Sequence, residues 1–254
     1  MGKVWASSDW HGCGKIADKV FEYLQSDDTL YFIGDACDRG PDGLRIMQRL
    51  LDDKRVIYLC GNHEEMMTLA IPALEESRTD MFVSQWFQNG GYETWSQMEL
   101  IKEVDRYNLI YQIKKLPFEQ KYINKNGDTI ILEHAGYTPG DIPHRSHDPL
   151  WDRAHFHDNW NKNNSKTKNT YLIHGHTPIQ YLKFDYGCKG STPLTKEELK
   201  IKNQWWLKDA QKDYKPTIFR YCDNHKFDID MCTIVSKRIA LLNLDTFEEV
   251  YFDE

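Results

Sequence analysis

Three short apolar runs near the start of the chain each end in a cluster of polar side chains, and this pattern constrains the fold most. The runs are Val4–Ser7, Leu30–Ile33 and Val56–Cys60, and each is rich in residues that favour buried β-strands. Between them, Lys15–Leu24 and Gly43–Leu51 carry apolar residues at helical spacing. Strands that alternate with helices predict βαβ units and a sheet that is at least partly parallel.

The rest of the chain extends this pattern without a clear boundary between domains. Residues 64–118 are predicted to be mostly helical, and an Asn-Gly-Gly turn interrupts them. Further strands are expected at Ile130–Glu133 and Tyr171–His174. With 254 residues, of which 40% are hydrophobic, the chain can bury a large core. We therefore interpret residues 1–254 as a single domain, with a mostly helical insertion at about 64–118 and an unassigned insertion at about 183–226.

Two features are expected in the last third of the chain. Thr195 and Glu198 have the spacing of a capping box, which predicts a helix over 195–213. The segments 227–235, 238–244 and 248–252 are rich in strand-forming residues. We expect these three segments to form antiparallel strands that close the domain.

Composition excludes several classes of protein. A formal net charge of −7 disfavours a nucleic-acid binder, which needs a basic face. No apolar run approaches the roughly 18 residues of a membrane span, so no membrane partner is expected. The six cysteines are scattered singly and form no C-x-x-C pair, which is typical of reduced thiols in a cytoplasmic protein. Nothing in the sequence indicates an oligomeric state.

Polar side chains follow five of the predicted strands at the point where each strand ends. They are Asp9 and His11; Asp35, Asp38 and Arg39; Asn62, His63 and Glu64; His134; and His174 and His176. In open α/β sheets, ligands bind at the carboxyl ends of strands. We therefore expect these side chains to converge at one edge of the core, where their charge needs a positive partner.

A pair of metal ions is the partner that suits this set of side chains. Asp, His and Asn provide oxygen and nitrogen ligands without a thiolate, which fits Mn, Fe, Zn or Ni better than a structural zinc site. Asp9 and His11 are expected on the same side of an extended segment, because side chains alternate along such a segment. A single carboxylate can bridge two metal ions that lie about 3.5–4 Å apart.

Taken together, the motifs resemble the calcineurin-like metallophosphoesterases, and more narrowly their phosphoprotein phosphatase branch. The motifs are D-x-H (Asp9, His11), G-D-x-x-D-R-G (Gly34–Gly40), G-N-H-E (Gly61–Glu64), His134 and G-H-T (Gly175–Thr177). That branch includes bacterial and phage serine/threonine phosphatases and symmetrical diadenosine tetraphosphate hydrolases. The segments "WFQNGGYET" (86–94) and "LWDR" (150–153) also resemble its bacterial members. The resemblance implies an α/β fold, a β-sandwich of mixed sheets flanked by helices, with a dimetal site at the carboxyl ends of the strands.

The resemblance also implies a set of metal ligands. Asp9, His11 and Asp35 would hold the first metal ion, and Asp35 would bridge to the second. Asn62, His134 and His176 would complete the second. Two divalent ions are implied, with Mn²⁺ expected first and Fe, Zn or Ni as alternatives. A hydroxide that bridges the metals would attack phosphorus directly.

Catalytic and phosphate-binding roles are implied by the same resemblance. His63 would act as the general acid for the leaving oxygen, and Asp38 would orient it. Arg39 and Asn62 would bind phosphate oxygens, and Arg153 would be a second clamp. One departure from the family lies in the tail, where Cys232 stands at the position of a glycine.

Three functions remain open at this point. The first is a metal-dependent phosphatase of the serine/threonine type, which acts on a phosphorylated substrate. The second is a symmetrical dinucleoside polyphosphate hydrolase, because the same core serves both reactions. The third is a non-catalytic metal-binding scaffold, which is disfavoured because His63, Arg39 and every ligand position are present. Residues 64–118, 138–170 and 183–226 are expected to decide the substrate, and the last of these carries Trp205 and Trp206.

Overall fold

A computed structural model provides the structure of the chain. It describes residues 2–136, 148–157, 160, 163–165, 167–186, 194–196, 198–199 and 214–254. The body of the helix expected over 195–213, with Trp205 and Trp206, lies outside the described residues, as does Cys188. Among the described residues, no helix has the length and apolar character needed to cross a membrane.

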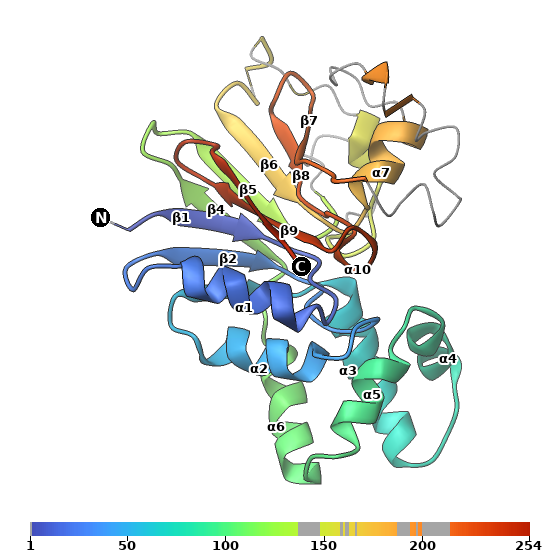
Figure 1. Ribbon diagram of the computed structural model, residues 1–254. Helices are drawn as coiled ribbons and strands as arrows, with labels where there is room; N and C mark the ends of the chain where they lie inside the picture. The colour runs from blue at the N-terminus through green and yellow to red at the C-terminus, as the bar shows by residue number, and fades with distance from the viewer. Residues whose placement is uncertain are drawn as a thin grey trace.

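Two five-stranded sheets pack face to face at the centre of the molecule (Figure 1). The first has the order β10-β9-β1-β2-β3, with β1 at Val4–Ser7, β2 at Thr29–Ile33, β3 at Val56–Leu59, β9 at Arg238–Asn243 and β10 at Glu249–Asp253. The second has the order β4-β5-β6-β8-β7, with β4 at Glu119–Ile123, β5 at Thr129–Glu133, β6 at Thr170–His174, β8 at Lys226–Asp228 and β7 at Phe219–Tyr221. Both sheets are mixed, since β1–β2–β3 and β5–β6–β8 run parallel while β9, β10, β4 and β7 pair antiparallel.

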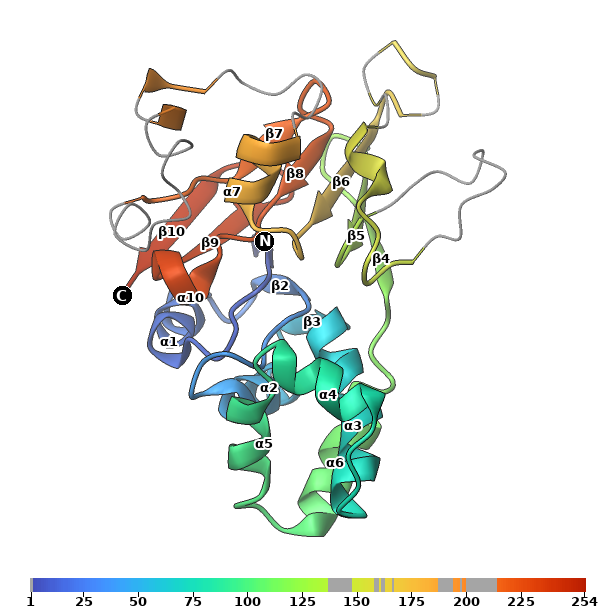
Figure 2. The same ribbon diagram turned by 90° about the vertical axis from the view of Figure 1, so that its right-hand side faces the viewer.

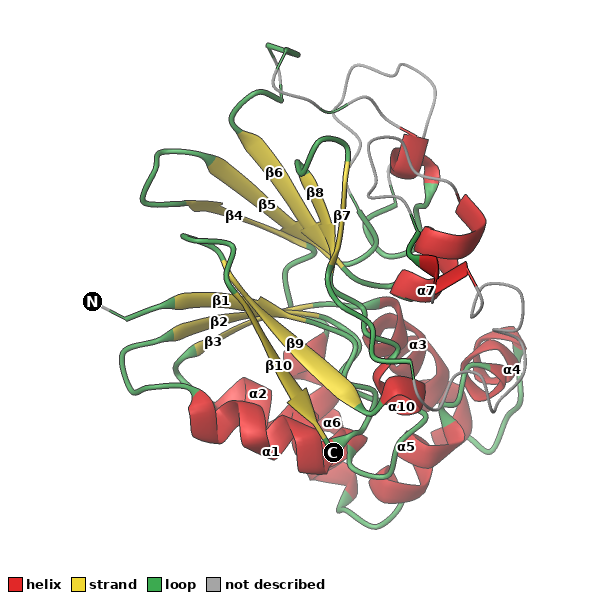
Figure 3. Cartoon of the chain, turned by 45° about the horizontal axis from the view of Figure 1, so that its top comes forward, coloured by secondary structure: helices red, strands yellow, loops and turns green. Residues whose placement is uncertain are grey.

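Helices flank the sandwich, and most of them lie beside the first sheet (Figure 3). The longer ones are α1 (Gly14–Tyr23), α2 (Gly43–Asp52), α3 (Asn62–Glu75), α4 (Met81–Gln88), α5 (Tyr92–Met98) and α6 (Glu103–Ile113). The shorter ones are η1 (Ala154–His157), α7 (Ile179–Tyr181), η2 (Leu182–Tyr186) and α10 (Thr233–Ser236). Helices α3 to α6 gather at one end of the molecule, next to the loops that leave β1, β2 and β3 (Figure 2).

The alternation of side chains along β1 and β2 divides the core into two layers. Trp5 and Phe32 are buried with the residues of α1 and α2, on the helix side of the first sheet. Ala6 and Ile33 are buried with β5 and β6 residues, between the two sheets. Because successive strand residues point to opposite faces, each short apolar run supplies both layers. This explains why these strands read as continuous apolar segments.

The structure confirms most of the predicted elements, corrects one of them and adds strand β4. Strands β1, β2, β3, β5 and β6 lie where they were expected. The segment 227–235 does not form one strand, because β8 ends at Asp228 and Thr233–Ser236 is helical. Strand β4 was not predicted, since Glu119–Ile123 is a charged edge strand without an apolar run.

Two smaller expectations from the sequence are also confirmed. The backbone N–H of Thr195 donates to Glu198, and the backbone N–H of Glu198 donates to the Thr195 hydroxyl, as a capping box requires. All cysteines in the described part of the chain are free thiols: Cys13, Cys37, Cys60, Cys222 and Cys232.

Candidate functional site

The loops that leave β1, β2, β3, β5 and β6 bring all six predicted metal ligands together. These ligands are Asp9, His11, Asp35, Asn62, His134 and His176, and each side chain is buried. They come from both sheets, so the site lies where the carboxyl ends of the two sets of parallel strands meet. The side chains that follow the predicted strands therefore lie close together in the structure, as their positions at the carboxyl ends of the strands predicted.

Asp35 lies at the centre of this group. Its Oδ2 atom is 3.7 Å from Nε2 of His11, and its Oδ1 atom is 3.4 Å from Nε2 of His134. The two carboxylate oxygens therefore face different histidines, one from each side of the group. Two sets of ligand atoms share Asp35: one consists of Asp9, Asp35 and His134, and the other of His11, Asp35 and His63. This arrangement is the one expected of a carboxylate that bridges two ions.

Asn62 joins the remaining ligands. Its Oδ1 atom lies 2.9 Å from Nε2 of His134 and 3.1 Å from Nδ1 of His176. Asp9 accepts a hydrogen bond of 3.1 Å from the backbone N–H of His176, so the loops after β1 and β6 are tied together. The oxygen and nitrogen atoms of all six side chains thus form one connected cluster.

The backbone of this cluster is unusual. Asp9, His11, Asp35 and His176 all have positive φ, between 42° and 66°. The expectation that Asp9 and His11 share one side of an extended segment was therefore wrong, because the chain turns at both residues. Left-handed backbone at residues other than glycine costs about 1–3 kcal/mol each and gathers at functional sites. Here it lets consecutive loop residues point into the same small volume.

The ionisable groups shift one another's pKa strongly. Burial opposes the ionisation of Asp35, but the nearby His134, His63 and His11 outweigh it and hold its pKa well below the ordinary value. Burial also opposes the protonation of His134, yet Asp35 and Asp9 raise its pKa to about 10. Asp9 behaves differently, because burial together with the charges of Asp230 and Asp35 raises its pKa well above the ordinary value. Too few positive charges face the Asp9 carboxylate, which is the condition that a bound cation would relieve.

Two histidines, His11 and His134, are oriented as metal ligands usually are. The Nδ1–H of His11 donates to the carbonyl of Cys37 at 3.0 Å, and the Nδ1–H of His134 donates to that of Ile33 at 2.7 Å. Such bonds fix the ring and leave Nε2 for a metal. In His176, the buried Nε2 atom has no hydrogen-bond partner in the part of the chain that the structure describes. The oxygen and nitrogen donors, together with this buried and unpaired nitrogen, fit a pair of divalent ions.

His63 and Asp38 form a buried pair beside the ligands. The Nδ1 atom of His63 donates to Oδ2 of Asp38 at 2.6 Å. Asp38 also accepts from Nε1 of Trp86 at 2.8 Å and from the hydroxyl of Thr94 at 2.6 Å. The sequence pointed to His63 and Asp38 but not to the two donors from the helical insertion. The only earlier signal was the resemblance of residues 86–94 to bacterial phosphatases.

The two predicted arginine clamps lie at the mouth of the cluster. The guanidinium of Arg39 donates to Nε2 of His11 at 2.8 Å and to Nε2 of His63 at 3.0 Å. Arg153 donates to the hydroxyl of Thr177 at 2.9 Å, next to His176. Both side chains therefore reach the group from its exposed side, and Arg39 would have to turn away from His11 to free that ring nitrogen for a metal.

Glu64 holds the loops after β2 and β3 together, a role that the sequence did not reveal. Its carboxylate accepts hydrogen bonds from the backbone N–H groups of Asp35 and Ala36 at 2.8 Å and of Gly61 at 2.9 Å. The Tyr58 hydroxyl donates to it at 2.8 Å. Burial and the charge of Asp35 raise the pKa of Glu64. The last residue of the G-N-H-E motif thus holds the backbone of Asp35 in place.

His174 does not join the ligands, although it lies two residues from His176. Its Nε2 atom is 2.8 Å from the Tyr221 hydroxyl, and its Nδ1–H donates to the carbonyl of Gly175 at 3.1 Å. Burial lowers its pKa to about 3, so the ring is neutral and serves as a hydrogen-bonding support.

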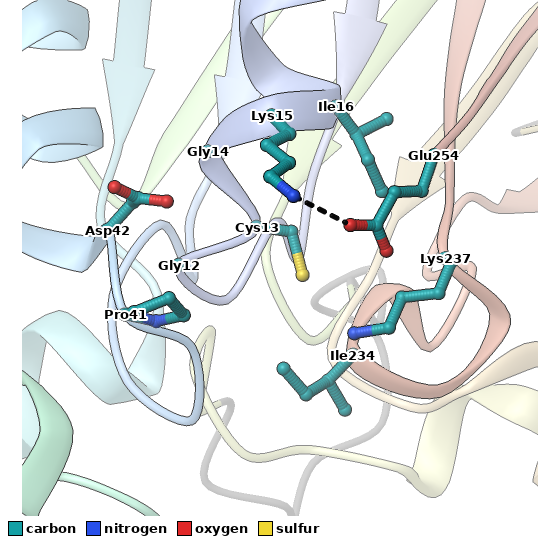
Figure 4. Close-up of a pocket in the computed structure, with 10 residues that line it drawn as sticks. All are labelled: Gly12, Cys13, Gly14, Lys15, Ile16, Pro41, Asp42, Ile234, Lys237 and Glu254. Atoms are coloured by element: carbon teal, nitrogen blue, oxygen red, sulfur yellow. Dashed lines mark ion pairs between the residues drawn. The ribbon is translucent and has the colours of Figure 1, made fainter.

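A cavity of about 200 Å³ lies beside the turn that follows His11 (Figure 4). Cys13 and Lys237 line it, and Lys15 pairs with Glu254 across one side at 3.6 Å. No predicted catalytic residue or metal ligand lines this cavity. It is therefore separate from the cluster around Asp35.

Comparisons with known proteins found a matching family model and several relatives of the chain. The family model described as "Calcineurin-like phosphoesterase" matches residues 2–217. The chain is 27% identical over 184 residues to "Serine/threonine-protein phosphatase 1" of Salmonella typhimurium, which covers 70% of this chain and 79% of that protein. It is 25% identical over 144 residues to "Bis(5'-nucleosyl)-tetraphosphatase, symmetrical" of Buchnera aphidicola, over 54% of this chain and 45% of that protein. The matched region therefore spans less than half of the tetraphosphatase.

Solved structures show the same fold at low sequence identity. A protein serine/threonine phosphatase from Saccharomyces cerevisiae superposes with a TM-score of 0.53 at 13% identity, over 100% of this chain and 80% of that one. The sandwich of two mixed sheets flanked by helices is thus the fold that the sequence predicted.

Proposed function

The chain belongs to the calcineurin-like phosphoesterase family and is therefore a hydrolase, and we propose that it is a metal-dependent phosphatase of the serine/threonine type. The observation that carries this proposal is the position of Asp35 between His11 and His134, with the His63–Asp38 pair alongside. This is the arrangement needed to hold two metal ions, a phosphoryl group and a proton donor within one small volume.

The proposed metal site uses the six side chains already described. Asp9, His11 and Asp35 would hold one ion, while Asp35, Asn62, His134 and His176 would hold the other. When bound, the two ions lower the pKa of an attacking water and neutralise charge on the phosphoryl group. Mn²⁺ is the proposed native metal, and the oxygen and nitrogen donors support it without excluding Fe, Zn or Ni.

The chain's own residues would do the rest of the chemistry. Arg39, Asn62 and Arg153 bind the phosphoryl oxygens, and the planar guanidinium of Arg39 suits two of them at once. His63 keeps its Nδ1–H on Asp38 and presents Nε2 to the substrate. Once Arg39 has turned to the phosphate, Nε2 of His63 carries a proton to the leaving oxygen as the P–O bond breaks. The leaving group then departs as a neutral alcohol.

A phosphorylated protein is the proposed substrate class. This choice is supported by how much of each relative the chain matches: 79% of the serine/threonine phosphatase but 45% of the symmetrical tetraphosphatase. The dinucleoside polyphosphate reaction remains the second candidate, because the same metals, arginines and histidine serve both. A scaffold without activity is disfavoured by the intact set of ligands around Asp35.

The substrate class is tested with metal-stripped protein that is resupplied with Mn²⁺. A phosphoserine peptide and diadenosine tetraphosphate are compared at equal concentration, and His63→Asn is the control. The proposal predicts faster release of phosphate from the peptide, with loss of that activity in His63→Asn. Symmetrical cleavage of the dinucleotide with little turnover of the peptide would replace the proposal with the second candidate.

A further inference from the structure

Asp38 receives more hydrogen bonds than its role toward His63 requires. Its Oδ2 atom accepts from His63 and from the indole Nε1–H of Trp86, at 2.6 and 2.8 Å. Its Oδ1 atom accepts from the hydroxyl of Thr94 at 2.6 Å, and that hydroxyl in turn accepts from the backbone N–H of Asp38 at 2.8 Å. Asp38, Trp86 and Thr94 are all completely buried. The carboxylate therefore cannot rotate without breaking a bond in a region that water does not reach.

The two extra donors come from a different part of the fold. Trp86 lies near the end of α4 and Thr94 in the first turn of α5, while Asp38 follows β2. The turn between the two helices leaves room for the indole of Trp86 to reach Asp38. A Cβ atom on Gly91 would lie 2.4 Å from Nε1 of Trp86, so only a glycine allows the indole to occupy its position. On the other side of the turn, the carbonyl of Gly90 accepts the backbone N–H of Arg39 at 3.1 Å.

We propose that Trp86 and Thr94 are positioning residues, through which the helical insertion holds Asp38 and thereby aims His63 at the leaving oxygen. The inference rests on the proposed role of His63 as proton donor. Of the two oxygens of Asp38, Thr94 holds Oδ1 and Trp86 shares Oδ2 with His63. Together they fix the plane of the carboxylate, and the carboxylate fixes the plane of the imidazole.

The helical insertion is thus part of the catalytic apparatus as well as a cover for the sheet. Residues 86–94 form hydrogen bonds with two consecutive residues of the G-D-x-x-D-R-G loop, Asp38 and Arg39. A change in the turn between α4 and α5 would therefore move His63 and Arg39 together.

The test compares substrates that differ in their need for a proton. Phenyl phosphate releases a weakly acidic phenol and needs a proton on the leaving oxygen, whereas 2,4-dinitrophenyl phosphate releases a stable anion. Trp86→Phe removes the indole N–H and keeps an aromatic ring, and Thr94→Val removes the hydroxyl and keeps the shape. Each variant removes a donor to a different oxygen of Asp38, so either one suffices if the other fails to fold. Bound Mn²⁺ and thermal midpoints are measured for every variant.

Two matched variants serve as controls. Trp5→Phe removes another buried indole N–H, which donates to Asp28 at 3.3 Å far from the site, and should leave turnover unchanged. Thr94→Ser keeps the hydroxyl and should restore the activity that Thr94→Val loses.

The proposal predicts that kcat on phenyl phosphate falls about 10- to 100-fold in Trp86→Phe and Thr94→Val, as is usual when an outer partner is removed. On 2,4-dinitrophenyl phosphate kcat should stay near the wild-type value, and KM and bound Mn²⁺ should not change.

Equal losses on the two substrates, or no loss on either, would overturn the inference. If His63→Asn itself lacks the difference between substrates, the proton-donor role fails and the inference fails with it. If His63→Asn shows the difference and Trp86→Phe and Thr94→Val do not, only the inference is overturned.

Discussion

Nδ1 of His63 lies 2.6 Å from Oδ2 of Asp38, and both side chains are buried at the edge of the metal-ligand cluster. This contact fixes the orientation of the imidazole ring. Nδ1 points its proton at the carboxylate of Asp38, and Nε2 is the nitrogen proposed to face the substrate. Because a buried carboxylate accepts only from a donor, Nδ1 of His63 must hold a proton. Nε2 is the nitrogen left for the leaving oxygen.

Asp38→Asn should therefore damage turnover more than binding. An amide can present its NH₂ group to Nδ1, which favours the opposite tautomer and leaves Nε2 unsuited to its task. We expect kcat on phenyl phosphate to fall about 10²- to 10⁴-fold, the usual share of a general acid. Steady-state kinetics with parallel metal analysis provide the measurement. Wild-type kcat in a fully metal-loaded Asp38→Asn protein would contradict the assigned role.

Substitution of Asp35 should weaken the binding of both metal ions, and substitution of His176 should weaken the binding of only one. Removal of an outer partner alone weakens metal binding about 10- to 100-fold, so loss of the bridging ligand in Asp35→Asn should cost more. We expect calorimetric titration with Mn²⁺ to lose both tight binding steps in Asp35→Asn and one step in His176→Asn. Asp53→Asn, which changes a carboxylate that pairs with Arg55 at the surface, is the control. Two unchanged steps in Asp35→Asn would show that this carboxylate does not bridge.

Glu64→Gln should destabilise the protein even without metal. The Glu64 carboxylate accepts from three backbone N–H groups and from Tyr58, whereas a glutamine would turn an NH₂ group toward some of these donors. Leaving one buried N–H unpaired costs about 1–3 kcal/mol in the free energy of unfolding. Urea unfolding of the metal-free protein measures this loss of stability. Tyr58→Phe serves as a milder change, which should lower the free energy of unfolding by about 1 kcal/mol. Identical unfolding midpoints for Glu64→Gln and the wild type would refute the bracing role.

His155 should make the folded state sensitive to acid. Burial, with smaller effects from His174 and Lys226, lowers its pKa well below the ordinary value, so the folded protein keeps this ring neutral. In the unfolded chain the ring binds a proton below about pH 6.5. Stability should therefore be complete above that pH and fall as the pH drops toward the folded pKa, by roughly 1 kcal/mol for each pH unit.

The variant His155→Gln isolates this contribution. Its amide nitrogen can still donate to the carbonyl of Ala135, which Nε2 of His155 contacts at 2.9 Å, but it does not titrate. Urea unfolding of metal-free protein at pH 7 and pH 5 should show a smaller loss of stability in the variant than in the wild type. Equal losses would mean that His155 is not the group responsible.

Much of the site was predictable because its signals are local. Each ligand directly follows a short apolar strand, and the carboxyl ends of parallel strands meet at one edge. The convergence of the residues that follow these strands could therefore be predicted, while the choice of Asp9, His11, Asp35, Asn62, His134 and His176 as ligands came from the family resemblance. Strands β1 to β3 and helices α1 and α2 followed from simple periodicity for the same reason.

What could not be predicted depends on contacts between distant residues or on backbone geometry. Trp86 and Thr94 reach Asp38 across 48 and 56 residues, and no periodic pattern marks such a contact. The positive φ of Asp9 and His11 is invisible to an argument based on strand alternation. Thr233–Ser236 has strand-forming residues, yet it lies between two αL residues, Cys232 and Lys237, and forms a helical turn instead.

Whether the cluster around Asp35 is a catalytic dimetal centre is tested most directly by phosphate ester hydrolysis as metal is restored. Metal-stripped protein is titrated with Mn²⁺ while the hydrolysis of p-nitrophenyl phosphate is followed. We predict no activity without metal, a rise that saturates near two ions per chain, and no such rise in Asp35→Asn. Full activity of the stripped protein, or none at any level of bound metal, would contradict the account.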